Sequence, residues 1–302
     1  MDSIENSGTP VGRPARPLVS VVIPTRNSEQ TLRLCLNSTL RQTYSNVEIV
    51  VVDQASEDGT RKIAEESGIE VISIPFGGIY LPPTVSRNVG TKVSRGRYLL
   101  HIDSDMELTP RVIESCIELA LQGEQAIIIP EVDFSSNFWG RCKALERSCY
   151  LGDPIFETPR FFSWDILHRI RGYDESLRGG EDWDISTRLR NARVPIARTK
   201  ECLYHHIEDF DFFKNLRKKY NGGRSFQAYR NKHPQASTQT LTVLRSAFWR
   251  NRSRLARDPL HATGFGIQKL LEAYCTWRGM LKPLNSDDRS WPLQPHVPRG
   301  AR

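Results

Sequence analysis

Residues 97–105 have the sequence Arg-Tyr-Leu-Leu-His-Ile-Asp-Ser-Asp. The largely apolar run from 98 to 102 predicts a buried β-strand, and two acids, Asp103 and Asp105, follow directly after it. Carboxylate oxygens at a strand end are ligands with which a protein can hold Mg²⁺ or Mn²⁺. An ordinary polar junction between a strand and a loop is the alternative explanation. The stretch therefore predicts a strand and offers a candidate metal site at its end.

Strand-like and helix-like segments alternate on both sides of this stretch. The expected strands cover residues 18–24, 47–52, 70–74, 97–102 and 126–130. Alternation of this kind predicts a doubly wound α/β sheet, in which ligands bind beyond the carboxyl ends of the strands. Asp53 follows the second strand as Asp103 and Asp105 follow the fourth. The three carboxylates are therefore expected at one edge of the sheet.

Amphipathic helices are expected between these strands. Asn27 is the predicted N-cap of the first helix, with Gln30 three residues later. Thr109-Pro110 predicts the start of another, because proline favours the first helical position, and Gly96 is expected to close the helix before it. The apolar faces are predicted to contain Leu32, Cys35, Leu36, Thr39 and Leu40, then Val85, Val89 and Val93, then Ile113, Cys116, Ile117, Ala120 and Leu121.

The pattern changes after about residue 135. A loop and helix are expected over 135–152, a strand over 160–167, and a helix from about Asp182, with two more helical stretches past Pro234. The chain is accordingly divided into a disordered leader (1–17), an α/β domain (18–208), a basic helical extension (209–282) and a disordered tail (283–302). The domain itself is divided near residue 130, into parts 18–130 and 131–208.

Composition excludes several classes of protein. The chain has 302 residues, of which 38% are hydrophobic and 25% charged, enough to bury a core. No apolar run approaches the roughly 18–20 residues that cross a bilayer, and the polar, Pro-rich start lacks the apolar region of a secretory signal. The six cysteines form no Cys-x-x-Cys pair, which favours reduced thiols over a disulfide framework or zinc site. A cytoplasmic protein is expected.

Positive charge is concentrated in one segment. Residues 214–257 contain 12 of the 42 Lys and Arg residues and no acid, so the rest of the chain is net acidic. Aromatic residues are interleaved with these charges, and Leu241, Leu244 and Phe248 fall on one helical face. One interpretation is an interfacial helix on an anionic membrane, peripheral at the inner face of the plasma membrane. The alternative is a solvated basic face whose aromatics pack onto the domain or a second subunit.

Two further clusters of polar residues could perform chemistry. Glu181 and Asp182 follow two glycines and precede a tryptophan at a predicted helix start. One of these acids could serve as a general base, although an acid at a helix N-terminus is also favoured by the helix dipole alone. His205 and His206 could complete a metal shell or meet a diphosphate; a purely structural role is the alternative.

Five segments, taken in order, resemble the motifs of the family 2 glycosyltransferases, which share the GT-A fold. Residues 19–27 are similar to the family's opening strand and nucleotide loop, and residues 48–60 to its second-strand signature. Residues 86–90 resemble the segment whose arginine approaches the nucleotide. Residues 98–105 match the strand with the Asp-x-Asp motif, and residues 179–183 the Glu-Asp motif. The resemblance covers about 19–206, roughly two thirds of the chain.

The resemblance implies a metal-dependent transferase with Mn²⁺ or Mg²⁺ as cofactor. The donor is a nucleotide-diphosphate sugar bound by Pro24, Thr25, Arg26, Asn27, Asp53, Gln54, Arg87, Asp103 and Ser104, in the half of the domain from 18 to 130. The metal ligands are Asp105, Asp103 and His205. In the acceptor half, 131–208, Asp182, with Glu181 beside it, deprotonates an acceptor hydroxyl for one inverting displacement. The implied acceptor is a glycan or a polyprenyl-linked sugar.

One residue departs from the family's pattern. Gln54 follows Asp53 where some members carry a second acid that reads a uracil, so UDP-, GDP- and dTDP-sugars all remain open. A nucleotidyltransferase would carry a Gly-rich loop after the first strand, which residues 24–27 lack. A nucleic-acid-binding module would leave the acidic motifs unexplained, so no nucleic-acid partner is expected. A non-catalytic nucleotide-sugar-binding protein of the same fold remains the other alternative.

Overall fold

The computed structural model of the protein describes residues 16–77, 81–153, 155–177, 179–207, 210–235 and 246–281. Within them the chain forms a larger sheet of strand order β3-β2-β1-β4-β8-β6-β9 and a smaller sheet of order β5-β10-β7. The larger sheet contains β1 (Val19–Thr25), β2 (Val47–Asp53), β3 (Val71–Ser73), β4 (Tyr98–His101), β6 (Ala126–Ile128), β8 (Pro159–Ser163) and β9 (Ile196–Arg198). The smaller contains β5 (Met106–Leu108), β7 (Glu131–Phe134) and β10 (Leu203–His206).

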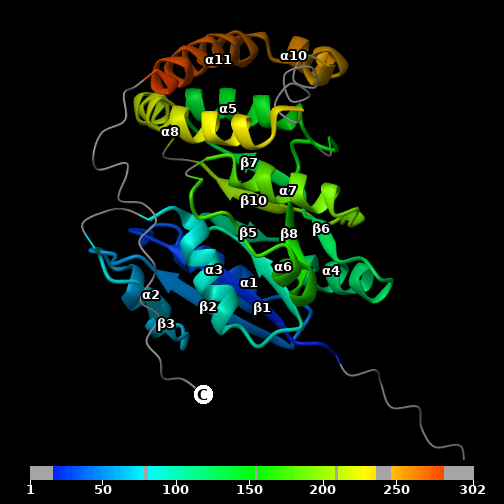
Figure 1. The fold of residues 1–302 in the computed structure, drawn as a ribbon. Coiled ribbons are helices and arrows are strands. Elements are labelled where there is room, and N and C mark those ends of the chain that lie inside the picture. Colours follow the sequence, from blue (N-terminus) through cyan, green and yellow to red (C-terminus); the bar gives the residue numbers. More distant parts are fainter. Residues whose placement is uncertain are drawn as a thin grey trace, which may run out of the picture.

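The larger sheet is mostly parallel, and helices connect its strands (Figure 1). β3, β2, β1 and β4 are parallel to one another, and β8 lies antiparallel between β4 and β6. The helices are α1 (Leu32–Leu40), α2 (Thr60–Glu66), α3 (Pro83–Val93), α4 (Val112–Leu121), α5 (Phe138–Ser148), α6 (Trp164–Arg169), α7 (Glu181–Asn191), α8 (Phe212–Lys232), α10 (Arg252–Arg257) and α11 (Pro259–Met280). The predicted α/β class is confirmed. The predicted leader, apart from residues 16 and 17, and the predicted tail lie outside the described residues.

The side chains of β1 alternate between the two faces of the larger sheet, as in any strand. Val21 and Ile23 join the main core, which α1 and α4 cover. Val22 points to the other face, where α3 packs so closely that a Cβ at Gly90 would overlap the Val22 side chain. Helices therefore cover both faces, and the carboxyl end of β1 is left as an edge where a ligand can be reached.

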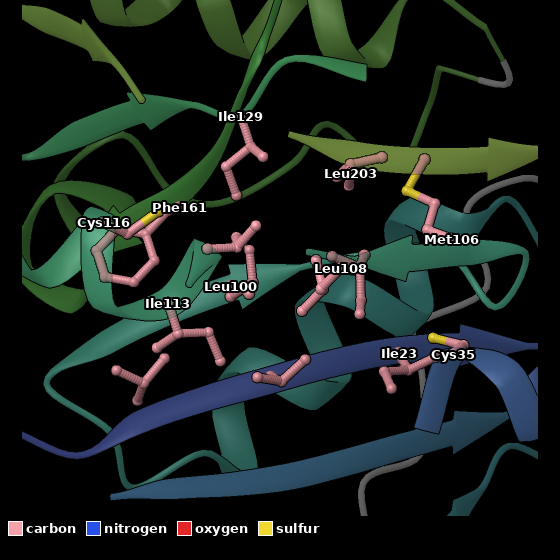
Figure 2. Packing of buried hydrophobic residues seen from close by; sticks show 14 of the residues in the cluster. Ile23, Cys35, Leu100, Met106, Leu108, Ile113, Cys116, Ile129, Phe161 and Leu203 are labelled. Carbon is pink, nitrogen blue, oxygen red and sulfur yellow. The ribbon is translucent and has the colours of Figure 1, made fainter. Parts of the chain in front are cut away.

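The smaller sheet extends the main core and holds two polar segments of the site. Met106, Leu108 and Leu203 point from it into the same cluster as Ile23 and Leu100 (Figure 2). The sequence patterns did not predict this sheet, because its strands are too short to show a hydrophobic period. The pairing of β5 with β10 in this sheet matters for function. It places the segment after the Asp-x-Asp motif beside the segment that contains the two histidines.

Several local predictions are wrong. Asn27 is not the N-cap of α1: it has a positive φ of 47°, and the helix begins at Leu32 after Thr31. Leu40, Leu121 and Val93 are exposed rather than buried. Gly96 does not close α3, which ends at Val93. Glycine is required at position 96 because β1 passes so near that a Cβ would clash with Ser20.

Several aromatic residues of the basic segment pack inward, as the second interpretation of that segment expects, whereas Phe213 and Trp249 are exposed. The Phe212 ring stacks on Trp139 of α5 with 4.1 Å between centroids, and Phe248 contacts Phe265 of α11 at 4.9 Å. Tyr229 is buried. The predicted interfacial helix was based on Leu241, Leu244 and Phe248. Leu241 and Leu244 lie outside the described residues. Phe248 therefore belongs to the packing between helices.

A cluster of paired charges lies between α5, α8 and α11. Lys143 Nζ is 2.7 Å from Glu146 Oε2, and Lys269 Nζ is 2.9 Å from Glu146 Oε1. Glu272 of α11 pairs with the same two lysines at 3.5 and 3.2 Å and accepts a hydrogen bond from Asn215 of α8. Burial alone would raise the pKa of Glu146, but the two lysines outweigh it and lower that pKa to about 2. The cluster thus joins α5 and α11 through ionised groups, and α8 through the amide of Asn215.

Helices α8 and α11 approach each other at two glycines, which yields a stability prediction. A Cβ at Gly279 would collide with the backbone carbonyl of Tyr220, and one at Gly223 would lie 2.5 Å from the carbonyl oxygen of Thr276. Backbone atoms cannot rotate away, so Gly279→Ala should lower the free energy of unfolding by about 1–3 kcal/mol or more. Gly266→Ala in the same helix, where a Cβ meets no atom within 4 Å, should instead raise it by about 0.5–1 kcal/mol.

Urea unfolding of the two variants, followed by circular dichroism, measures this difference directly. Gly266→Ala is the matched control, since it makes the same chemical change in the same helix on an open face. Equal stability of the two variants would show that α8 and α11 do not pack in this close arrangement.

Candidate active site

The carboxyl ends of β1 and β2 meet in a tight polar junction. Thr25 pairs with Asp53 in the strand register, and its hydroxyl donates to the Asp53 carboxylate at 3.1 Å. The backbone N–H of Ser56 donates to the same carboxylate at 3.0 Å, and Asp53 is fully buried. Pro24 lies just before this junction. It is past the part of β1 that pairs with β4, so its lack of an N–H removes no hydrogen bond between β1 and β4. Asp53 therefore links the ends of β1 and β2 to the loop that follows β2.

The loops after β1 and β2 are held to each other and to the acidic strand end. Asn27 accepts a hydrogen bond from the backbone N–H of Glu57 at 2.9 Å. Ser104, between the two acids of the Asp-x-Asp motif, donates from its hydroxyl to the Ser28 hydroxyl at 2.8 Å. The predicted binding residues of three strand ends are thereby brought to one edge of the sheet.

A shallow depression, open to solvent, lies beside this junction. Its lining residues are Arg26, Gln54, Ile74, Pro75, Phe76 and Leu81. The Arg26 guanidinium lies 5.8 Å from the centre of the Phe76 ring. Gln54 is turned away from solvent and donates from Nε2 to the Ser86 hydroxyl at 2.8 Å. The depression thus combines a cation and a flat apolar wall, a combination that suits a planar ring.

Arg87 of α3 joins the acidic strand end to the acidic helix start. Its Nη2 donates to Asp103 Oδ1 at 2.6 Å, and its Nη1 lies 3.4 Å from Asp182 Oδ1. The guanidinium also lies 5.2 Å from the centre of the Tyr173 ring, and the side chain is only 3% exposed. A cation so deeply buried must be paired. Residues 87, 103 and 182 therefore form one electrostatic unit.

Arg160 is a functional candidate that the sequence analysis missed. Arg160 lies in β8, the neighbour of β4 in the sheet, and its Nη1 is 3.5 Å from Asp103 Oδ2. Its Nε donates to Glu131 Oε1 at 2.5 Å. Burial would raise the pKa of Asp103, but Arg87 and Arg160 together lower it well below its ordinary value. Asp103 is thus held ionised by two arginines, and both of its oxygens are engaged.

Asp105 has a different environment. The pairing of β5 with β10 sets Met106 opposite His205, and His205 Nε2 lies 3.2 Å from Asp105 Oδ2. The other ring nitrogen lies 3.2 Å from Asp133 Oδ1. Burial would lower the pKa of His205, but the hydrogen bonds to these two carboxylates outweigh it and raise the pKa to about 9. His205 therefore bridges the carboxylates of Asp105 and Asp133, and the Arg147 guanidinium also lies 2.9 Å from its Nδ1.

The donor atoms at Asp105 fit a divalent cation. Its Oδ1 is buried and has no hydrogen-bond partner among the described residues, as expected of an oxygen kept open for a ligand. Those same residues contain no cluster of three or more His, Cys, Asp or Glu side chains arranged as a metal centre. Mg²⁺-type sites need no more than one or two carboxylates when substrate phosphates supply the remaining ligands. His205 could join them only after losing its proton.

The two candidate catalytic acids begin α7. Gly180, the N-cap, has a φ of 81°, which favours glycine, and a Cβ there would also touch the Tyr229 ring at 3.4 Å. At position 180 the backbone conformation and the Tyr229 contact together account for glycine. The pKa of Glu181 is raised by burial and by the neighbouring Asp182. Of the two acids, Asp182 is the one that Arg87 reaches.

Not every predicted residue belongs to this constellation. His206 Nε2 lies 2.9 Å from Glu107 Oε2, on strands of the smaller sheet, and takes no part in the network of Arg87. Tyr173, like Arg160, escaped the sequence analysis, because both lie outside any local motif and reach the site only through the packing of β8 and the loop before α7. Both residues are buried.

Proteins of known sequence or structure resemble this chain over the same region. Glycosyltransferase EpsJ of Bacillus subtilis is 33% identical over 117 residues, 37% of this chain and 33% of EpsJ. The Escherichia coli UDP-Glc:alpha-D-GlcNAc-diphosphoundecaprenol beta-1,3-glucosyltransferase WfgD is 29% identical over 123 residues, 40% of this chain and 47% of WfgD. The chain thus spans less than half the length of these two relatives.

A solved structure confirms the fold. The mannosyltransferase PcManGT from Pyrobaculum calidifontis, determined with GDP-Man and Mn²⁺, superposes with a TM-score of 0.55 at 19% identity, covering 88% of this chain and 84% of the other. At that identity the likeness concerns the architecture alone. The family model of glycosyl transferase family 2 matches residues 20–174, half of the chain, so the chain belongs to glycosyl transferase family 2.

Proposed function

We propose that the protein transfers a sugar from a nucleotide-diphosphate sugar to an acceptor hydroxyl, with inversion at the anomeric carbon. The observation that carries this proposal is the chain of ion pairs Asp103–Arg87–Asp182. It joins an acid at the end of β4, where a donor is expected in this fold, to an acid at the start of α7. Membership of the family supports the same reaction class.

Each group in the site has a role in the proposed reaction. The depression beside Arg26 and Phe76 receives the nucleotide base, and the junction of Thr25 and Asp53 shapes the neighbouring ribose site. Asp103, held by two arginines, orients the donor from the end of β4. Asp182 accepts the proton of the acceptor hydroxyl as that oxygen attacks the anomeric carbon. A single displacement of this kind inverts the configuration.

A divalent cation, Mn²⁺ or Mg²⁺, is part of the proposal. Asp105 would hold it through the open Oδ1, with Asp103 and His205 as the other candidate ligands. When bound, such a cation neutralises charge on the diphosphate leaving group. That PcManGT was determined with Mn²⁺ supports a cation of this class in the fold.

The acceptor is proposed to be a glycan or a sugar carried on a polyprenyl diphosphate. WfgD, named as a glucosyltransferase that acts on a diphosphoundecaprenol-linked sugar, supports the second class. An acceptor of that kind resides in a membrane, so we place the working enzyme peripherally at the inner face of the plasma membrane.

A panel of donors tests the reaction. The protein is incubated with UDP-, GDP- and dTDP-sugars, with Mn²⁺ or Mg²⁺, and with lipid-linked and free glycan acceptors, and the release of nucleoside diphosphate is measured. We expect release that depends on the acceptor for one donor, and NMR of the product should show an inverted anomeric centre. Release of inorganic diphosphate from a nucleoside triphosphate and a sugar phosphate would indicate a nucleotidyltransferase instead. Donor binding without turnover would indicate a binding protein.

A further inference from the structure

Helix α11 has two faces of different character. One packs against α8 and α5 and contains the buried residues His261, Gly264, Phe265, Gln268, Glu272 and Gly279. The opposite face, here called the outer face of α11, exposes Leu260, Ile267, Leu270, Leu271, Tyr274, Trp277 and, at the C-cap, Leu281. These side chains are between 38% and 75% exposed. Figure 1 shows α11 at the end of the molecule, with α8 and α5 between it and the sheets.

The spacing of these residues makes a continuous apolar strip. From Ile267 to Leu281 they recur at intervals of one, three and four, so they share one side of the helix. Leu260 lies on the same side two turns earlier, with the exposed Thr263 between them. From residue 267 to residue 281 the strip is about 21 Å long at the usual helical rise. Isolated exposed apolar residues are normal, but a contiguous strip of this length marks a surface that is covered when the protein works.

The C-terminal helices that include the strip are rich in positive charge. In the described part of residues 212–281 the acids are Asp258 and Glu272; Asp258 is bound to His261, and Glu272 is buried with Lys143 and Lys269. The exposed charged residues there are Lys214, Arg217, Lys218, Arg230, Lys232, Arg250, Arg252, Arg254, Arg257 and Arg278. Of these, Lys232 and Arg250 are paired with Asp174 and Asp153. Arg278 lies on the outer face itself, four residues after Tyr274 and seven after Leu271. A partner for this surface must tolerate, or attract, cations.

Charge complementarity distinguishes the two main candidates for that partner. A second copy of the chain, packed strip against strip, would bring two basic surfaces together, and like charges at an interface are unfavourable. A bilayer that contains anionic lipid offers both an apolar boundary for the strip and negative charge for the arginines around it. Trp277 and Tyr274 are the side chains that favour the level of the lipid headgroups. Trp249, 71% exposed, lies beside Arg252 in the same layer of helices.

We propose that the outer face of α11 lies flat on the surface of an anionic membrane. The choice of a membrane rests on the proposed function, because a lipid-linked acceptor must be met at a bilayer. Among the described residues, no helix combines the length and apolar character that a membrane-spanning segment needs. The attachment is therefore in the plane of the interface. It differs from the interfacial helix expected from the sequence around Phe248, whose side chain is used in packing against Phe265.

Vesicle flotation of the full-length protein tests this surface. Vesicles of neutral phosphatidylcholine are compared with vesicles that also contain phosphatidylglycerol, and the bound fraction is measured. We expect binding at least about tenfold stronger to the anionic vesicles, since each basic residue near a charged surface contributes to attraction. Leu270→Glu with Trp277→Glu should abolish flotation, and Arg278→Glu alone should reduce it. Leu121→Glu on α4, where leucine is 64% exposed, is the matched control and should float normally.

Other measurements separate the possible failures. The circular dichroism and melting temperature of each variant show whether it is folded, and Arg278→Glu, a single exposed change, keeps the test valid if the double variant unfolds. Release of nucleoside diphosphate with a water-soluble acceptor should be the same in all folded variants, so a membrane defect is distinguished from a failure of the proposed reaction. Absence of flotation by the unmodified protein, or flotation that the double variant retains, would overturn the proposal. A dimer in analytical ultracentrifugation that only the double variant loses would assign the strip to a second copy.

Discussion

Asp182→Asn should lower kcat by about 10²–10⁴-fold while the affinity for the donor changes little, because general-base catalysis contributes about that much. The substitution keeps the size and hydrogen-bonding shape of the side chain and removes its ability to take a proton. Asp182 is also 3.4 Å from Arg87, but Arg87 keeps its shorter bond to Asp103, so the site should stay assembled. Initial rates of nucleoside diphosphate release and calorimetric titration with the donor measure the two quantities.

Two further substitutions make the result specific. Glu181→Gln tests the adjacent acid, and the expected loss there is smaller, because Glu181 is not the acid that Arg87 reaches. Asp165→Asn removes an exposed acid in the first turn of α6 and should have no effect on rate. If Glu181→Gln proved the more damaging change, the proton would have to be assigned to Glu181. Near-normal turnover in both would mean that neither acid is the base.

Asp105→Asn should remove divalent-cation binding and lower turnover by at least about 100-fold. Neutralisation of a departing diphosphate by a metal is worth several kcal/mol, and each 1.4 kcal/mol is about a factor of ten in rate. The buried Oδ1 without a partner is the reason for choosing Asp105 as the principal ligand. Electron paramagnetic resonance of free Mn²⁺ measures the binding without any turnover, and addition of EDTA to the unmodified enzyme should abolish activity reversibly.

Asp103→Asn provides the contrast within the same motif. Both Asp103 oxygens face arginines, so this change should weaken donor binding and destabilise the buried cations more than it weakens Mn²⁺ binding. The two acids of the motif then have different roles: Asp105 binds the cation, and Asp103 pairs with the arginines. Loss of Mn²⁺ binding in Asp103→Asn together with its retention in Asp105→Asn would reverse this assignment.

The elements that the sequence predicted are those with a strong local signal. β2 and β4 are apolar runs long enough to show their character, and acids stand directly at their carboxyl ends, so this edge of the sheet could be predicted without knowledge of the packing. Arg160 could not, because its contact with Asp103 depends on β8 lying antiparallel beside β4. Nor could the ion pair of His205 with Asp105, which depends on a three-residue strand, β5, with no detectable period.

Local signals were also misleading where tertiary structure supplies a stronger interaction. Asn27 has the composition of an N-cap, yet its side chain is bonded to the backbone of Glu57 in the neighbouring loop. Phe248 has the pattern of a membrane-facing residue, yet it fills the space beside Phe265. In both cases a partner distant in sequence determines the environment. The exposed strip of α11 is visible only once the buried face of that helix is known.

The buried charges that link α5 and α11 limit how this enzyme could be rearranged by recombination. Removing one partner of a buried ion pair leaves an uncompensated charge, at a cost of about 3–5 kcal/mol. Glu146 and Lys143 come from α5, inside the family's fold, whereas Lys269 and Glu272 come from α11. A chimera joined after residue 208 would therefore take the α5 and α11 members of this charge cluster from different proteins. The C-terminal helices are not a detachable module, and a functional transplant would have to carry α5 with them.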